Sequence, residues 1–201
     1  MKRVTGIIQR AAASLIVLSL IACGQASLSP AASTQQAAAT LDAEKKTYKH
    51  LVVGFAQVGA ESEWRTGNTQ SIQDAAESLG VELKFIDGQQ VQENQIAAIR
   101  TFIAQQVDVI GVSPVVETGW ESVFQEAKEA NIPIILVDRQ AAVPEDLYAT
   151  RLGSDFAEEG RNAARVMVKL LDGKGSIVEL TGTKDSAPAL DRYSGFREVL
   201  K

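Results

Sequence analysis

Short apolar runs alternate with amphipathic stretches along most of the chain. Four of the runs are rich in valine and isoleucine and have the length of a buried strand: residues 51–56, 81–86, 107–112 and 132–137. Between them, apolar residues recur three or four positions apart, the spacing that places side chains on one face of a helix. Buried strands that alternate with such helices favour a parallel sheet with helices on both faces. The pattern therefore predicts an α/β fold.

Three helical stretches join these four strands. The first ends at Gly80, which suits the C-cap of a helix because glycine adopts a left-handed backbone easily. The apolar stripes are Trp64, Ile72, Ala75, Ala76 and Leu79 in the first stretch, Ile96, Ile99 and Ile103 in the second, and Trp120, Val123, Phe124 and Ala127 in the third.

The alternation continues beyond the fourth strand but does not complete a second sheet. Residues 148–153 predict a fifth strand, 157–171 a helix, 176–180 a sixth strand and 187–201 a last helix. Two such units cannot bury a sheet alone, and no cap or helix breaker follows Leu200. Either a second lobe is cut short at its C-terminal side, or this part is a short addition to the first domain.

The first 23 residues have the features of a bacterial lipoprotein signal peptide. Positive charges in Met1–Arg3 and at Arg10 precede the apolar stretch Ala11–Ala22, which is shorter than the roughly 20 apolar residues that span a bilayer. The stretch runs into Cys23 through the letters LIAC, which resemble a lipobox whose cysteine is diacylated. We expect a lipid anchor at Cys23 that holds the protein in the cell envelope, in the periplasm or on the outer face of the membrane. The alternative is an ordinary signal peptide with an unmodified cysteine.

The segment that follows has the composition of a linker. Residues 24–47 are rich in alanine, serine, threonine and glutamine and lack an apolar period that could pack, so we expect a flexible tether. The folded part is then expected to comprise a first lobe at residues 48–154 and a partial second lobe at residues 155–201.

Composition excludes several functions. The formal net charge of −5 argues against a nucleic-acid-binding surface, which needs a basic footprint. With one cysteine and one histidine, His50, the chain offers no internal disulfide, no cysteine metal cluster and no histidine-based catalysis. The stretch GFAQVG lacks the lysine of a phosphate loop, and neither a dinucleotide fingerprint nor a nucleophile elbow occurs. No enzyme activity, cofactor or metal is expected.

Polar and aromatic residues follow the ends of the first four predicted strands. They lie in the segments 57–65 (QVGAESEWR), 87–90 (DGQQ) and 113–120 (SPVVETGW), and in the pair Asp138-Arg139. In an open parallel sheet, ligands bind in the crevice beyond the carboxyl ends of the strands. These groups are therefore expected to meet at one edge of the sheet.

The chemistry of these groups suits a carbohydrate. Asp138 can accept hydrogen bonds from neighbouring hydroxyls, and the guanidinium groups of Arg65 and Arg139 can donate to sugar oxygens. Trp64 offers a flat apolar surface for the C–H face of a ring. Simpler roles remain open: a core position for Trp64, a solvated charge for Arg65 and an ion pair that finishes a strand for Asp138-Arg139.

Two glutamines near this edge are expected to have structural roles. Gln89 and Gln95 are better suited to satisfying the backbone of a loop or a helix than to contacting a ligand.

Four stretches carry a resemblance to a known family. They read VGFAQVGAESEWR, IDGQQVQENQIAAIRTFIAQQVDVIGVSPVVETGW, IPIILVDR and ALDRYSGF, and they resemble bacterial periplasmic sugar-binding proteins of ABC importers, of the ribose and galactose type. The likeness covers about residues 51–201 and is greatest to members that take galactofuranose. It implies the type I fold of periplasmic binding proteins, a doubly wound parallel sheet with two lobes that close on one sugar, here a first lobe and an incomplete second one.

The resemblance also implies roles for particular residues. Trp64 would stack on the sugar ring, while Arg65, Asp138 and Arg139 would bind its hydroxyls from the first lobe. Arg192 of the ALDRYSGF stretch would reach in from the second lobe, and Ser62 is a weaker candidate ligand.

The implied function is that of a monomeric solute-binding lipoprotein. It would capture a galactofuranose-like monosaccharide and deliver it to an ABC permease in the membrane. A binding protein that presents sugar to a membrane receptor or a histidine kinase fits the sequence as well. A repressor core of the same fold is disfavoured, because such a protein carries a DNA-binding head where this chain has a signal peptide.

Overall fold

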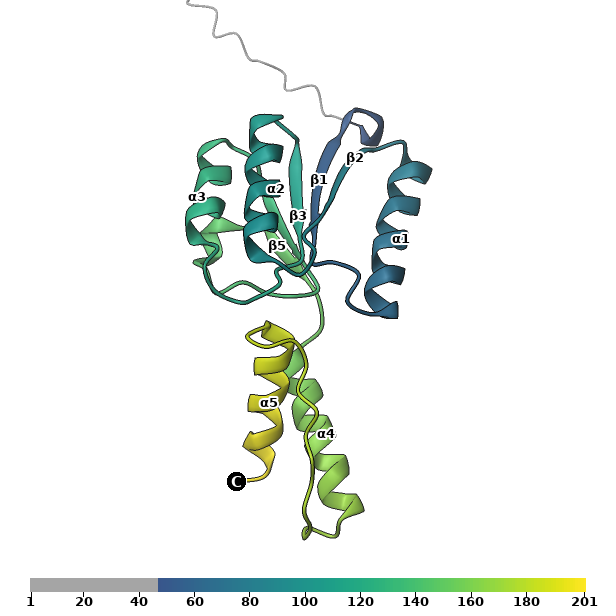
Figure 1. Cartoon of the computed structure of the whole chain (residues 1–201), viewed down its shortest axis with the longest axis vertical. Helices are drawn as coiled ribbons and strands as arrows, with labels where there is room; N and C mark the ends of the chain where they lie inside the picture. The colour runs from purple at the N-terminus through teal and green to yellow at the C-terminus, as the bar shows by residue number, and fades with distance from the viewer. Residues whose placement is uncertain (1–46) are drawn as a thin grey trace, which may run out of the picture. The chain divides into compact units, whose positions relative to one another are not determined.

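Five parallel strands form the centre of the structure, a computed structural model that describes residues 47–201. The strands pair in the order β2-β1-β3-β4-β5, as an open doubly wound sheet (Figure 1). Their bounds are Val52–Gln57 for β1, Glu82–Asp87 for β2, Val109–Val112 for β3, Ile134–Val137 for β4 and Thr150–Leu152 for β5. The predicted α/β class and the type I arrangement are confirmed.

Helices cover both faces of this sheet. Helix α1 (Glu63–Leu79) lies on one face, and α2 (Gln92–Ala104) and α3 (Glu121–Glu129) lie on the other (Figure 1). Short 3-10 turns occur at Tyr48–His50 and Glu145–Leu147. Within residues 47–201, no helix combines the length and the apolar character that a membrane span requires.

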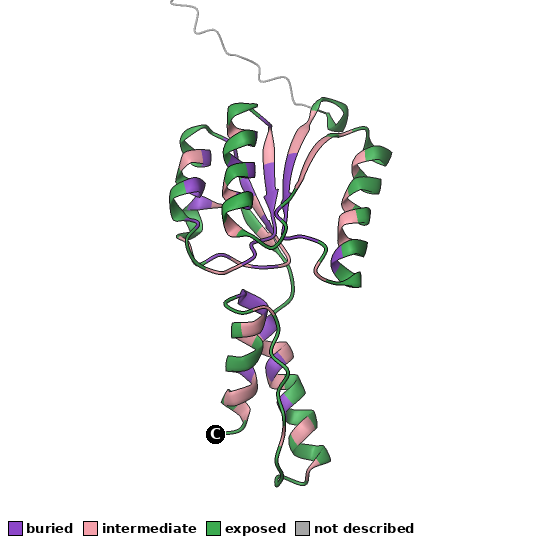
Figure 2. Cartoon of the chain, in the orientation of Figure 1, coloured by how far each residue is buried: buried purple, intermediate pink, exposed green. Residues whose placement is uncertain are grey.

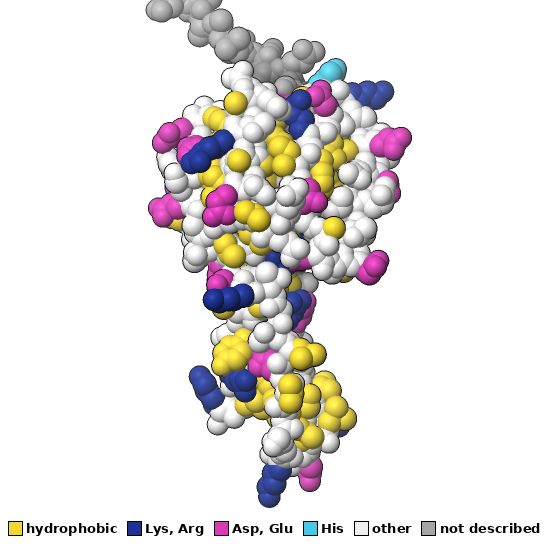
Figure 3. All heavy atoms as spheres, viewed as in Figure 1, with side chains coloured by type: hydrophobic (Ala, Val, Ile, Leu, Met, Phe, Trp, Pro, Cys, Tyr) yellow, Lys and Arg dark blue, Asp and Glu magenta, His cyan; other side chains and the backbone are white. Residues whose placement is uncertain are grey.

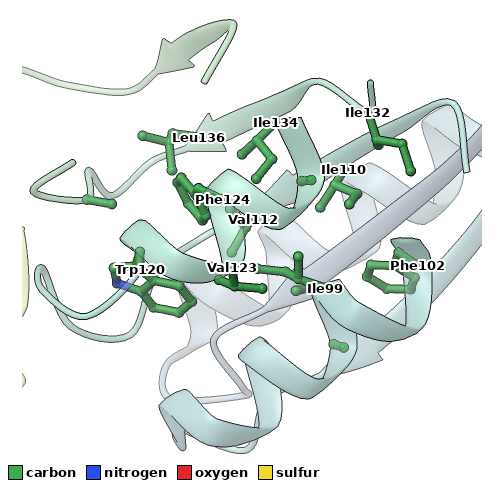
Figure 4. Close-up of a cluster of buried hydrophobic side chains, with 14 of the residues drawn as sticks. Ile99, Phe102, Ile110, Val112, Trp120, Val123, Phe124, Ile132, Ile134 and Leu136 are labelled. Atoms are coloured by element: carbon green, nitrogen blue, oxygen red, sulfur yellow. The ribbon is translucent and has the colours of Figure 1, made fainter. Parts of the chain in front are cut away.

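The hydrophobic core lies between the sheet and the α2–α3 layer. Figure 4 shows Ile99 and Phe102 from α2 and Phe124 from α3 facing the strands. Ile110, Val112, Ile134, Leu136, Trp120 and Val123 are buried with them. Gly54 leaves room for the ring of Phe102, because a Cβ there would stand 2.5 Å from that ring. The helical stripe predicted for the third stretch is confirmed, since all four of its residues are buried.

The opposite face, under α1, is more open and more polar. Arg65 is the only residue of α1 that is buried, and most of the helix surface is exposed or half-buried (Figure 2). On the sheet beneath it, Phe55 stacks on Phe85 with ring centroids 6.1 Å apart. Gln57 donates from Nε2 to the side chain of Asn68 on α1 at 2.9 Å. This face therefore places polar groups next to the carboxyl ends of the strands.

Two packed helices follow the sheet, α4 (Phe156–Leu170) and α5 (Ala187–Val199). Their backbones approach closely at two glycines. A Cβ at Gly160 would clash with the carbonyl of Arg192, and one at Gly195 would clash with the carbonyl of Ala157. The helices therefore pack backbone against backbone.

The sixth predicted strand is wrong. Residues 176–180 form no strand, and the side chains of Val178 and Leu180 are 89% and 94% exposed. An apolar, valine-containing run becomes a strand only when another strand supplies its hydrogen bonds, and the described residues provide no neighbour for it. Predicted strands also began up to two residues early: β3 starts at Val109 and β4 at Ile134.

Candidate ligand-binding site

A cavity of about 330 Å³ lies at the carboxyl ends of β1 and β4, where α1 begins and where α4 and α5 approach the sheet. All six residues singled out in the sequence line it: Ser62, Trp64, Arg65, Asp138, Arg139 and Arg192. They are brought together from three separate stretches of the chain, as the edge rule for parallel sheets anticipates.

The first turn of α1 sets the positions of three of these residues. Ser62 is the N-cap, and its Oγ accepts a hydrogen bond from the backbone N–H of Arg65 at 3.2 Å. This cap fixes the start of the helix and hence the directions of the side chains that follow. Trp64 is 59% exposed, so a core role for it is wrong. The guanidinium carbon of Arg65 lies 4.8 Å from the centroid of the Trp64 ring.

Arg65 is buried, with 2% of its surface exposed, and so is not a solvated charge. Its Nη2 donates to Oδ2 of Asp138 at 2.7 Å, and its Nη1 donates to Oγ of Ser113 at 3.1 Å. Longer contacts of 3.4 to 3.5 Å join it to Glu61 and Asn68. Every nitrogen of this guanidinium therefore has a protein partner.

Asp138 and Arg139 do not pair with each other. Asp138 pairs with Arg65, and Arg139 pairs through Nη2 with Oε1 of Glu61 at 2.5 Å. Nη1 of Arg139 donates to the carbonyl of Val115 at 3.1 Å. The two charged residues after β4 are thus paired with α1 and with the loop before it, across the carboxyl ends of the strands.

Two hydrogen-bonding atoms of this pair have no partner among the described residues. The Nε of Arg139 is buried and donates to nothing, and Oδ1 of Asp138 accepts no hydrogen bond while Oδ2 takes Arg65. Burial lowers the pKa of Arg139, and the carboxylate of Glu61 opposes that shift. A buried donor without an acceptor is costly.

Glu61 is a site residue that the sequence reasoning missed. Its Oε1 lies 3.4 Å from Nη2 of Arg65 and also accepts from Arg139, so one carboxylate joins the two buried cations. Its other oxygen lies 3.5 Å from Oγ1 of Thr183. The available signal was its place in the loop after β1, four residues before Arg65.

Arg192 enters the site from α5. Its guanidinium pairs with Glu159 of α4 at 2.7 Å and lies 4.6 Å from the ring centroid of Phe156. Its side chain is half exposed. A second cavity, of about 470 Å³, shares Glu61, Arg139 and Arg192 with the first and extends to residues 179–183.

The two glutamines near the site make different hydrogen bonds. Gln95 is buried; it donates to the carbonyls of Ala56 and Ser113 and accepts from the N–H of Val115, so its predicted backbone role is confirmed. Gln89 has a left-handed backbone and donates its N–H to Asp87 at 2.7 Å.

The structure does not address the N-terminal predictions. The signal peptide predicted at residues 1–23, the acylation predicted at Cys23 and nearly all of the linker predicted at 24–47 fall outside the described residues.

Comparison with known proteins assigns this fold and site to a protein family. Residues 53–201 match the family model described as the periplasmic binding protein domain, and the chain belongs to that family.

Among curated relatives, the chain is 48% identical over 153 residues to the galactofuranose-binding protein YtfQ of Escherichia coli K12. That alignment covers 75% of this chain and 48% of the relative. The chain therefore spans about half the length of the curated relatives it matches.

Two solved structures show the same likeness. One is the binding component of the arabinose ABC transporter of Shewanella sp. ANA-3, bound to α- and β-L-arabinofuranose; it has 49% identity, a TM-score of 0.71, and coverage of 74% of this chain and 50% of that one. The other is the fructose-binding periplasmic domain of a hybrid two-component system, with 31% identity, a TM-score of 0.67, and coverage of 75% and 50%.

Proposed function

We propose that the chain is the sugar-capturing part of a solute-binding lipoprotein. It binds a galactofuranose-like monosaccharide and delivers it to an ABC permease. One observation carries the proposal: Asp138, whose Oδ1 accepts no hydrogen bond from the described residues, and Arg139, whose buried Nε has no partner among them, line one cavity with the exposed Trp64. A donor, an acceptor and an apolar surface within one small cavity are what a sugar ring requires.

Each of these groups has a specific task. Neighbouring sugar hydroxyls can donate to Asp138 and accept from Arg139, so the two residues read adjacent positions on the ring. Arg65, whose donors are all occupied, serves mainly to hold Asp138 in place. Trp64 covers the C–H face of the sugar and is backed on its other side by the guanidinium of Arg65.

The size of the cavity supports a small ligand. Its volume of about 330 Å³ lies at the lower end of the range of about 300–1,000 Å³ for small-molecule sites. The names of two similar proteins also favour a furanose ring, since one binds galactofuranose and another was solved with arabinofuranose. Residues of the first lobe contact one side of the sugar, and Arg192 of α5 contacts it from the other side.

The proposal includes the organisation of the chain. Residues 48–154 form the first lobe and 155–201 the beginning of the second, while Cys23 carries a lipid that keeps the protein at the membrane. The protein works as a monomer, and binding needs no catalysis, cofactor or metal.

Sugar sensing is a second candidate function. One of the similar structures is the fructose-binding periplasmic domain of a hybrid two-component system, which supports this alternative. The binding chemistry is the same in both cases, and the partner differs.

Calorimetric titration tests the binding proposal. We expect the chain to bind L-arabinose or D-galactose, which equilibrate with their furanose forms in water, and Asp138→Asn to weaken binding at least tenfold, about 1.4 kcal/mol. The matched control is Asp146→Asn, which removes an exposed carboxylate paired with Lys128 away from the cavity and should leave affinity unchanged. Equal affinities of the two variants would contradict the assignment of the site.

A further inference from the structure

The backbone of Asp138 is held in an unfavourable conformation. Its φ is 65°, in the left-handed region that residues with a side chain rarely adopt. Such strain persists only where surrounding contacts determine it, and it tends to occur at binding sites. Here the turn directs the carboxylate of Asp138 toward Arg65 and the cavity.

Two hydrogen bonds from β5 hold this turn. The N–H of Asp138 donates to the carbonyl of Leu152 at 2.7 Å, and Nη1 of Arg151 donates to the carbonyl of Asp138 at 3.2 Å. Gly153 allows the close approach, because a Cβ there would clash with that same carbonyl.

Arg151 also forms hydrogen bonds to the backbone where the chain leaves the sheet. Its Nη1 and Nη2 both donate to the carbonyl of Ser154 at 3.2 Å. The next residue, Asp155, is the N-cap of α4 and accepts from the N–H of Glu158 at 2.8 Å. One guanidinium therefore joins the strained turn of the site to the connection between β5 and α4. The planar fork of arginine can hold two carbonyls at once, which a lysine ammonium cannot do with the same geometry.

We propose that Arg151 is a positioning residue of the sugar site. It fixes the left-handed turn at Asp138 relative to the β5–α4 connection without touching the ligand, for Arg151 is not among the residues that line the cavity. The inference rests on the proposed sugar-binding function, and it adds a residue that neither the sequence motifs nor the cavity lining identified.

The test compares Arg151→Met with Arg165→Met in the 201-residue chain. Arg165 is an exposed arginine of α4 that pairs with Glu158, so its replacement removes the same charge far from the turn. We expect Arg151→Met to bind L-arabinose about tenfold more weakly, which is about 1.4 kcal/mol, with a melting temperature close to that of the control. Arg165→Met should bind like the unchanged chain.

A ligand-free measurement separates this proposal from the proposed function. Hydrogen exchange should become faster at residues 138–139 and 152–155 in Arg151→Met and stay unchanged in Arg165→Met. If the unchanged chain binds no sugar, the proposed function fails, and exchange still decides whether Arg151 holds the turn. Unaltered exchange at these residues would overturn the positioning role.

Arg151→Lys distinguishes the fork from the charge. The lysine keeps the positive charge but cannot span both carbonyls, so we expect its affinity and exchange to resemble those of Arg151→Met. Full restoration of both by lysine would show that charge alone matters and would overturn the proposal.

Discussion

The sheet body, residues 52–152, and the helix pair, α4 and α5, are held together in different ways. The sheet body buries large apolar side chains, among them Trp120, Phe102 and Phe124. The helix pair contributes only Phe156 and small residues to the buried set, and Figure 3 shows hydrophobic side chains gathered on the surface over it. Leu170, Val178 and Leu180 are among those exposed.

The difference teaches where a rigid site can be built. The pairs Asp138–Arg65 and Arg139–Glu61 lie on the sheet body and its α1 side, so they are arranged before any ligand arrives. Arg192 lies on the helix pair, half exposed and paired with an exposed carboxylate. Ligand affinity and the rigidity of the site should therefore depend mainly on the sheet body. The helix pair should be the less rigid part.

The largest expected effect is in the core of the sheet body. Phe124→Ala removes a fully buried ring and should lower the free energy of unfolding by about 3–5 kcal/mol. Val178→Ala, at an 89% exposed position after α4, should change it by about 0.5 kcal/mol or less. Denaturant unfolding measures both, and similar losses for the two variants would remove the proposed contrast.

The helix pair can be tested by adding one methyl group. Gly195→Ala should destabilise it by about 1–3 kcal/mol, because the new Cβ meets the backbone of Ala157 and overpacking of this kind is costly. The control is Gly67→Ala on α1, where no atom lies within 4 Å of the new group; it should stabilise by about 0.5–1 kcal/mol through the helix preference of alanine. Opposite signs are expected, and a neutral Gly195→Ala would mean that the helices can separate freely.

Trp64 should affect ligand binding but not stability. Trp64→Ala removes an aromatic contact worth about 0.5–1.5 kcal/mol, which corresponds to a loss of affinity for L-arabinose of about two- to tenfold. Because the ring is 59% exposed, the melting temperature should barely move. Tyr48→Ala, at a similarly exposed aromatic residue that does not line the cavity, serves as the control. A large fall in melting temperature with normal affinity would assign Trp64 to packing.

The smallest expected effect concerns the pH dependence of the helix pair. Burial raises the pKa of Asp191, nearby Arg151 opposes the shift and Asp155 adds to it. The folded state therefore binds the proton more readily than the unfolded state, and the ionised carboxylate costs stability at neutral pH. That cost disappears as the pH falls through the raised pKa toward the unfolded value.

Replacement by asparagine exposes this cost. Asp191→Asn keeps an acceptor for Gln140, which donates to this side chain at 3.1 Å, and should raise the free energy of unfolding at pH 7 by about 0.5 kcal/mol or less. The gain should vanish in acid, where the aspartate is neutral as well. Melting curves at several pH values check the sign; a loss of stability at pH 7 would show that the charge is favourable.

The sequence predicted the sheet body well because local pattern and final packing agree there. The four runs rich in valine and isoleucine became β1 to β4 and residues 148–153 became β5, each starting within two residues of the prediction, and Gly80 adopts the left-handed C-cap with φ of 68°. The strand predicted at 176–180 is wrong because strand formation depends on a neighbouring strand, which the periodicity of the sequence cannot reveal. The local sequence pattern predicts an element reliably when the element has an apolar face that packs on the core. It is unreliable when the element needs a hydrogen-bonding partner from a distant part of the sequence.

The candidate site was predictable as a neighbourhood but not as a set of contacts. The rule that parallel strands end at one edge placed Trp64, Arg65 and Asp138 together. It could not show that Asp138 pairs with Arg65, since the two lie 73 residues apart in sequence. Glu61 and Arg151 were missed because their roles arise from distances in three dimensions.

The most direct test of the account is the NMR resonance of the Nε–H group of Arg139, assigned with Arg139→Lys. That donor has no partner among residues 47–201, whereas the Nε of Arg65 already donates to Glu61 at 3.4 Å. We predict that titration with L-arabinose shifts the Arg139 resonance saturably, with the dissociation constant found by calorimetry, and shifts that of Arg65 much less. An Arg139 resonance that stays in place while sugar binds would contradict the claim that this cavity is the sugar site.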